Sequence, residues 1–140
     1  MKKRVLFLCT HNSARSQMAE GLLRKQADDQ FEVFSAGTEA TRVHPMAIIA
    51  MRDAGIDISR QQSKTLDAFS GEHFDYVITV CDLANERCPI FPGDTARIHW
   101  SFDDPTAVTG TDEQRLHAFK QVRDMIRQRL RIFQTIAAGG

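Results

Sequence analysis

The chain has 140 residues, a length typical of one domain built around a single hydrophobic core. Basic and acidic residues number 18 each, so the formal net charge is +0 and nothing global favours nucleic acid or a membrane surface as partner. The sequence holds no apolar run of the roughly 18 residues that a transmembrane helix needs. The basic and apolar start, MKKRVLFLC, is too short for a signal peptide. We therefore expect one domain over residues 1–140, a cytoplasmic location and cysteines that stay reduced.

Hydrophobic patterning predicts strands that alternate with helices. The continuous apolar run at 4–9 is typical of a parallel strand covered on both faces, and good helix formers follow from Ser13. Further strands are expected at 31–37, 74–81 and 96–100, with a helix from Pro45 to Gly55 and a long amphipathic helix over 112–137. This order predicts an α/β fold, a four-stranded parallel sheet flanked by helices.

Cys9 and Cys81 each stand at the end of a predicted strand. In open parallel sheets, functional sites form at the carboxyl ends of the strands, near the point where the strand order reverses. We therefore expect both sulfurs at the same edge of the sheet, although they are far apart in the sequence.

The stretch CTHNSARS, residues 9–16, joins the first strand to the first helix. A tight loop before a helix N-terminus turns backbone N–H groups inward, and Arg15 adds a bidentate fork for a tetrahedral oxyanion. In that field Cys9 is expected to be a thiolate, with Ser13 and Ser16 as hydrogen-bond donors. The alternative is that Cys9 is a small buried hydrophobe. The expected oxyanion-binding residues are Thr10, His11, Asn12, Ser13, Ala14, Arg15 and Ser16.

The same stretch fits the C-x5-R-S signature and resembles the low-molecular-weight protein tyrosine phosphatases. The longer VLFLCTHNSARSQMAEG is still more similar to the arsenate reductases that share this fold. Four more motifs resemble those reductases in order and spacing, so the resemblance covers nearly the whole chain: SAG (35–37), GIDIS (55–59), CP (88–89) and HWSFDDP (99–105). It implies the low-molecular-weight phosphatase-like fold, with arsenate as substrate and with phosphate or sulfate as competing oxyanions.

The resemblance also implies roles for individual residues. Asp104 would be the general acid that protonates the leaving oxygen. Cys9 would attack arsenate, and Cys81 would then release arsenite by forming a Cys9–Cys81 disulfide. Cys88 would attack Cys81 in that disulfide, which frees Cys9 and leaves a Cys81–Cys88 disulfide. Thioredoxin would reduce the Cys81–Cys88 disulfide, although glutaredoxin with glutathione is an alternative electron donor. The enzyme would be a monomer and would need no tightly bound cofactor.

Three other interpretations compete with this reductase. A phosphatase of the same fold would need only Cys9, Arg15 and Asp104; Gln17 and Thr106 argue for the reductase, because many of those phosphatases carry proline and tyrosine there. An As(III)-binding thiol sensor would bind without turnover and would need no acid. A zinc site with His73 or His99 lacks close ligand pairs, so no metal is expected.

Some members of the resembled family bind potassium beside the cradle. Asn12, Glu20 and Ser35 match three of the positions used, but Lys64 stands where an aspartate is usual. We expect the Lys64 ammonium to replace the cation and to pair with Glu20. The alternatives are a solvated surface lysine, or an ion site that Asp67 restores.

Overall fold

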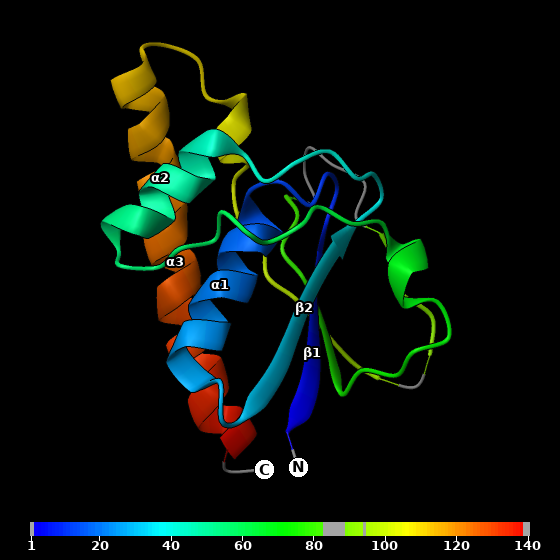
Figure 1. Ribbon diagram of the computed structural model, residues 1–140. Helices are drawn as coiled ribbons and strands as arrows, with labels where there is room; N and C mark the ends of the chain where they lie inside the picture. The colour runs from blue at the N-terminus through cyan, green and yellow to red at the C-terminus, as the bar shows by residue number, and fades with distance from the viewer. Residues whose placement is uncertain (1, 83–88, 94, 139–140) are drawn as a thin grey trace.

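The computed structural model describes residues 2–82, 89–93 and 95–138 (Figure 1). The elements, in chain order, are β1 (Lys3–Cys9), α1 (Arg15–Ala27), β2 (Phe31–Gly37), α2 (Pro45–Asp53), the 3-10 helix η1 (Leu66–Phe69), β3 (Tyr76–Thr79), β4 (Ala96–His99), the 3-10 helix η2 (Pro105–Ala107) and α3 (Asp112–Ala138). Among the helices so described, none combines the length and the apolar character needed to cross a bilayer.

The strands form one parallel sheet in the order β2-β1-β3-β4. The central strand β1 pairs over its whole length with β2, and its segment Val5–Leu8 pairs with β3. Residues 5–9 are all buried, as the continuous apolar run predicted. The expected four-stranded parallel α/β fold is confirmed.

Side chains of β1 alternate between two apolar layers. Val5, Phe7 and Cys9 face the layer that α1, α2 and α3 cover, and Figure 1 shows these three helices together on one side of the sheet. Leu6 and Leu8 face a smaller layer, which includes Phe69, Phe74 and Phe91 from η1 and the neighbouring loops. Within the described residues, the α-helices thus gather on one face, and a 3-10 helix with loops covers the other.

Some element boundaries differ from the sequence-based expectation. The strand expected over 74–81 pairs only from Tyr76 to Thr79, although Val80 and Cys81 are fully buried. Their apolar character reflects burial, which the hydrophobic pattern cannot distinguish from strand pairing. The first helix begins at Arg15 and not at Ser13, because Asn12, with a φ of 48°, lies in the left-handed region and delays the helix. The two 3-10 helices were not predicted.

The long helix α3 fixes the position of α2, whose first turn contacts the loop between β1 and α1. The expected apolar stripe of α3, which includes Phe119, Ile126 and Leu130, is buried. The buried Arg123 of α3 donates a 2.6 Å hydrogen bond to the Ala50 carbonyl of α2. His44, which caps α2, in turn donates its backbone N–H to the Ser13 carbonyl at 2.9 Å.

Candidate active site

The carboxyl ends of β1 and β3 lie side by side at the point where the strand order reverses. β1 leads outward to β2, whereas β3 leads the opposite way to β4. Cys9 ends β1 and is 2% exposed; Cys81 follows β3 and is fully buried. The Val80 N–H bonds the Leu8 carbonyl at 2.9 Å, and the Cys81 sulfur lies 4.0 Å from the same oxygen. The structure thus places both cysteines at one edge of the sheet.

Residues 10–14 form a cradle whose carbonyl groups turn outward. The Thr10, His11 and Ser13 carbonyls accept from the Glu39 N–H (3.0 Å), the Ser63 hydroxyl (3.1 Å) and the His44 N–H (2.9 Å) respectively. In a planar trans peptide the next residue's N–H points opposite to the carbonyl. The N–H groups of residues 11, 12 and 14 therefore point into the cradle, as an anion site requires.

The start of α1 adds to this site. Ala14 is the N-cap residue and supplies no side-chain acceptor for the first-turn N–H groups. Such N–H groups, with the positive end of the helix dipole, favour a bound anion. The Cys9 sulfur lies 2.8 Å from the Ser16 hydroxyl, which can donate to a thiolate. Negative charge on Cys9 or on a bound oxyanion is therefore stabilised at this point.

Asn12 holds the cradle in shape from below. Its side chain is fully buried and donates to the Ser16 hydroxyl (2.8 Å) and the Ser35 hydroxyl (3.0 Å). Its Oδ1 accepts from the Lys64 N–H (2.8 Å) and from Gln17 Nε2 (2.9 Å). Because Asn tolerates a positive φ better than most residues, one side chain supplies both the turn and its anchors.

Arg15, at the end of the cradle loop, forms an ion pair with Asp104. Arg15 is 3% exposed, and its Nη1 donates to the Phe102 carbonyl at 3.1 Å. Its Nη2 lies 3.7 Å from Asp104 Oδ2. The other carboxyl oxygen, Oδ1, accepts from the backbone N–H (2.9 Å) and from the hydroxyl (2.7 Å) of Thr106. The guanidinium of Arg15 and the carboxyl group of Asp104 thus lie close together.

Comparison with known proteins shows to which family the chain belongs. The sequence model of low molecular weight phosphotyrosine protein phosphatases matches residues 4–138. The chain belongs to this family. Arsenate reductases of Halalkalibacterium halodurans and Bacillus subtilis are 48% and 45% identical to it, over 94% of this chain and 95% and 94% of theirs.

Solved structures agree with this assignment. An arsenate reductase in a phosphate-binding state superposes with a TM-score of 0.77 at 34% identity, covering 94% of this chain and 95% of that one. The thioredoxin-dependent arsenate reductase of Corynebacterium glutamicum gives 0.66 at 29% identity, covering 99% of this chain and 64% of that one. A protein tyrosine phosphatase from T. tengcongensis, at 22% identity and 0.69, supports the shared fold alone.

Beneath the cradle of this phosphatase-family domain, Glu20 is held from two sides. Its Oε1 accepts from the Ser35 hydroxyl at 2.6 Å and its Oε2 pairs with Arg24 at 2.7 Å. Within the described residues, the ion pair on Glu20 therefore comes from Arg24 and not from the expected Lys64. Arg24 reaches it because residues four apart lie on one helix face. The Lys64 ammonium donates instead to the Gln62 carbonyl; burial lowers the pKa of Lys64, and the charge of Glu20 opposes that shift.

Two residues that support the cradle were not predicted as site residues. Gly37 lies where a Cβ would come within 2.7 Å of the Thr10 oxygen, so only glycine fits beside the loop. It belongs to the SAG motif, which was the available signal. Gln61 donates to the Gln17 side-chain oxygen at 2.8 Å and ties the cradle to the loop after α2; nothing local marks it in the sequence.

Two predictions from the sequence concern Cys88 and the absence of a metal site. Cys88 falls within 83–88, outside the described residues. In the described part of the chain, no group of three or more His, Cys, Asp and Glu side chains is arranged to hold a metal ion.

Proposed function

We propose that the protein reduces arsenate to arsenite, with Cys9 as nucleophile. One observation carries the proposal: two buried thiols, Cys9 at the end of β1 and Cys81 just after β3, lie at the same edge of the sheet, where the cradle loop leaves β1. The cradle and the acid alone would serve many oxyanion reactions. The second thiol supplies what reduction needs, a nucleophile that removes Cys9 from its adduct. The relatives named arsenate reductases support the same reading.

In the first step the Cys9 thiolate attacks arsenic. A sulfur–arsenic bond forms and one arsenic–oxygen bond breaks; the oxygen leaves as water after Asp104 supplies a proton. Arg15 and the inward N–H groups stabilise the negative charge on the remaining oxygens. Arsenic stays in the +V state, so this step is substitution and not yet reduction.

In the second step the Cys81 thiolate attacks the Cys9 sulfur. A disulfide forms, the sulfur–arsenic bond breaks, and its electron pair stays on arsenic, which leaves as arsenite in the +III state. The register supports this step, because Leu8 pairs with Thr79 and so sets Cys9 at the level of Val80, one residue before Cys81. Adjacent strands lie about 4.8 Å apart and one residue adds about 3.3 Å along a strand, so the two Cα atoms would lie about 6 Å apart, within the separation of about 7 Å that a disulfide tolerates.

In the third step Cys88 attacks the Cys81 sulfur of that disulfide and frees Cys9. Thioredoxin then reduces the Cys81–Cys88 disulfide, supplying the two electrons that arsenic received. The cycle uses no tightly bound cofactor. The cycle needs a reducing compartment, so we place the enzyme in the cytoplasm. We propose that it acts as a monomer.

Consumption of NADPH that depends on arsenate, with thioredoxin and thioredoxin reductase, tests the proposal. Cys9→Ser should abolish it, whereas Cys88→Ser should convert about one arsenate per enzyme and then stop, because the Cys9–Cys81 disulfide has no exit. Sustained turnover by Cys88→Ser would contradict the relay. A parallel assay with glutaredoxin and glutathione identifies the electron donor.

A phosphomonoester hydrolase is the second candidate, because the cradle, Arg15 and Asp104 would suffice for it. It would hydrolyse p-nitrophenyl phosphate through a Cys9 phosphocysteine, and that activity would survive Cys81→Ser and Cys88→Ser. An As(III) sensor would instead bind arsenite tightly and show no turnover in either assay.

We further propose that this enzyme works without potassium. Lys64 donates its backbone N–H to Asn12, and both Lys64 and Arg24 carry positive charge near Glu20 and Ser35. A bound cation would meet like charge at this place.

A further inference from the structure

A groove runs between β4 and the C-terminal half of α3, separate from the residues of the proposed mechanism. It has a volume of about 260 Å³, and its lining is mostly apolar. The lining includes Tyr76, Ile98, Trp100, Ile132, Phe133 and Ile136. We refer to it as the α3–β4 groove.

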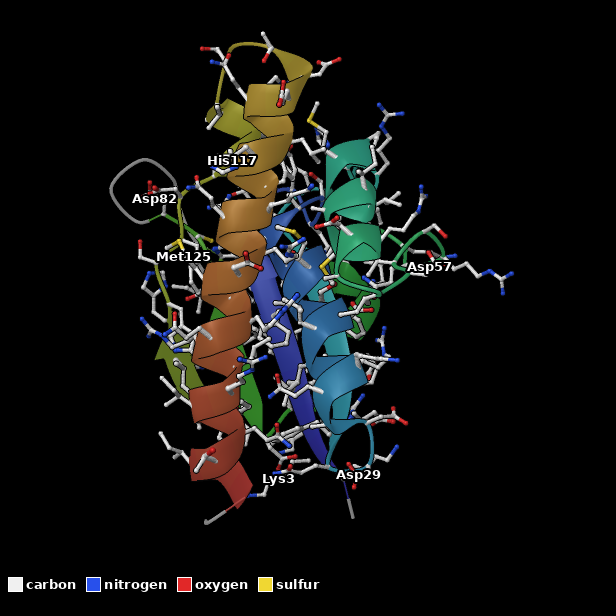
Figure 2. The ribbon with its side chains drawn as sticks, turned by 90° about the vertical axis from the view of Figure 1, so that its left-hand side faces the viewer. Lys3, Asp29, Asp57, Asp82, His117 and Met125 are labelled. Carbon is white, nitrogen blue, oxygen red and sulfur yellow. The ribbon has the colours of Figure 1, made fainter. Side chains whose placement is uncertain are left out.

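Beside this groove, α3 carries a second apolar stripe in addition to its buried one. Met125, Ile132 and Ile136 are 49%, 54% and 69% exposed. Spacings of seven and four residues put them on one helix face, and Figure 2 shows Met125 on the outer side of α3. Single exposed apolar residues are ordinary, but a stripe that continues into an apolar groove marks an interaction surface.

Two cations flank the groove, each over an aromatic ring of its lining. The Lys3 ammonium lies 5.7 Å from the centre of the Tyr76 ring, and the Arg129 guanidinium lies 5.7 Å from that of Trp100. Of the three arginines in this part of α3, Arg129 lines the groove, whereas Arg127 and Arg131 line a different hollow against α1 and the end of α2. The described lining of the groove contains no carboxylate. The surface is therefore apolar at its centre and basic at its rim.

This charge pattern selects among possible occupants. A second copy of the chain, paired about a two-fold axis, would offer the groove the same apolar and basic surface, whose described lining has no carboxylate to meet Arg129. A lipid surface is flat and would leave the hollow unfilled. The volume is below the 300–1,000 Å³ usual for small-molecule sites and suits one or two apolar side chains from a partner.

We propose that the α3–β4 groove binds an acidic segment of a partner protein, which inserts apolar side chains while its carboxylates meet Lys3 and Arg129. The carboxylates give the interaction its specificity and its salt dependence, and the inserted side chains exclude water from the aromatic floor. The inference does not depend on the proposed function, because none of the residues involved takes part in the reaction.

The single tryptophan of the chain, Trp100, reports directly on the groove. The probe is a short amphipathic peptide of leucine and glutamate without tryptophan, compared with one twin that carries lysine for glutamate and another that carries serine for leucine. We expect the acidic leucine peptide to change Trp100 fluorescence in a saturable way, and to bind at least about 10-fold more tightly than either twin at low salt.

Point variants locate the binding. Ile136→Ser and Arg129→Gln should each weaken the acidic peptide about 10-fold. Ile49→Ser is the matched control, because Ile49 is 44% exposed but lies on α2, outside the groove; it should change nothing. All three positions are exposed, and circular dichroism with thermal melts confirms that the variants are folded.

Four results would overturn the proposal. The first is the absence of saturable binding by the acidic peptide, and the second is equal binding by the lysine twin. The third is a dimer in sedimentation analysis that Ile136→Ser converts to monomer, which would assign the groove to a second copy. The fourth is Arg129-dependent binding to phosphatidylserine vesicles in place of the peptide, which would assign it to a membrane.

Discussion

Gly37→Ala tests whether the cradle depends on close packing against β2. Gly37 ends β2, pairs with Cys9 across the sheet, and donates its N–H to the Lys64 carbonyl at 2.9 Å. A Cβ added there would lie 2.7 Å from the Thr10 oxygen, 2.8 Å from the Asn12 nitrogen and 3.0 Å from the Cys9 oxygen. All three are backbone atoms, two in the cradle and one in Cys9 just before it, so no side-chain rotation relieves the overlap.

The size of the effect follows from these distances. Ordinary contact begins at 3.4 Å, so β2 or the cradle must move by about 0.7 Å, the difference between 3.4 and 2.7 Å. Overpacking of this kind costs about 1–3 kcal/mol of folding free energy. A misplacement near 1 Å can cost about 100-fold in rate, so we expect kcat/KM for arsenate to fall about 10- to 100-fold.

Three measurements check this reasoning: urea unfolding, arsenate turnover and phosphate binding by calorimetry. Gly71→Ala is the control. Gly71 has a φ of 82° and no neighbouring atom within 4 Å of an added Cβ, so that variant loses about 1 kcal/mol through backbone strain alone and keeps its phosphate affinity. Wild-type phosphate affinity and turnover in Gly37→Ala would refute the claim that the cradle has no room for a methyl group.

Three further predictions address the acid, the cation and the pH dependence. Thr106→Val removes the hydroxyl that orients Asp104 and should lower kcat for arsenate about 5-fold, whereas Thr106→Ser keeps a hydroxyl and should restore kcat. A changed inhibition constant for phosphate in Thr106→Val would show instead that the oxyanion site as a whole is disturbed. The kcat should be equal in potassium and tetramethylammonium salts, and several-fold activation by potassium would disprove the proposal that the enzyme works without potassium. Burial, aided by the charges of Arg115 and Arg42 and opposed by Asp104, lowers the pKa of His44. Folding therefore favours the neutral His44 ring. The contribution of His44 to the free energy of unfolding is fully present above about pH 6.5, and it is lost as the pH falls through the lowered pKa of the folded state. His44→Asn removes the titrating ring but keeps an acceptor for the Met46 N–H at the start of α2. Urea unfolding between about pH 5 and 8 should therefore show a smaller loss of stability at low pH in this variant than in the wild type. An unchanged pH profile would contradict the role assigned to His44.

The sequence by itself determined the features that depend on neighbouring residues. The alternation of apolar runs and amphipathic segments predicted the four parallel strands and the three α-helices. Cys9 ends a strand, Arg15 begins the next helix and Asn12 lies in the short loop between them, so their spacing sufficed to predict an oxyanion cradle. Asp104, far along the chain, was predicted only through the resemblance to a known family.

Only the tertiary structure decided the contacts between segments distant in the sequence. It placed Arg24 on Glu20 where Lys64 was expected, set Gly37 against the cradle, and gathered the α-helices of the described residues on one face of the sheet. Local spacing is set by the covalent chain, which the sequence displays in full. Contacts between residues that are distant in the sequence depend on how the helices and the sheet pack together in the core. The order of the residues does not state this packing directly.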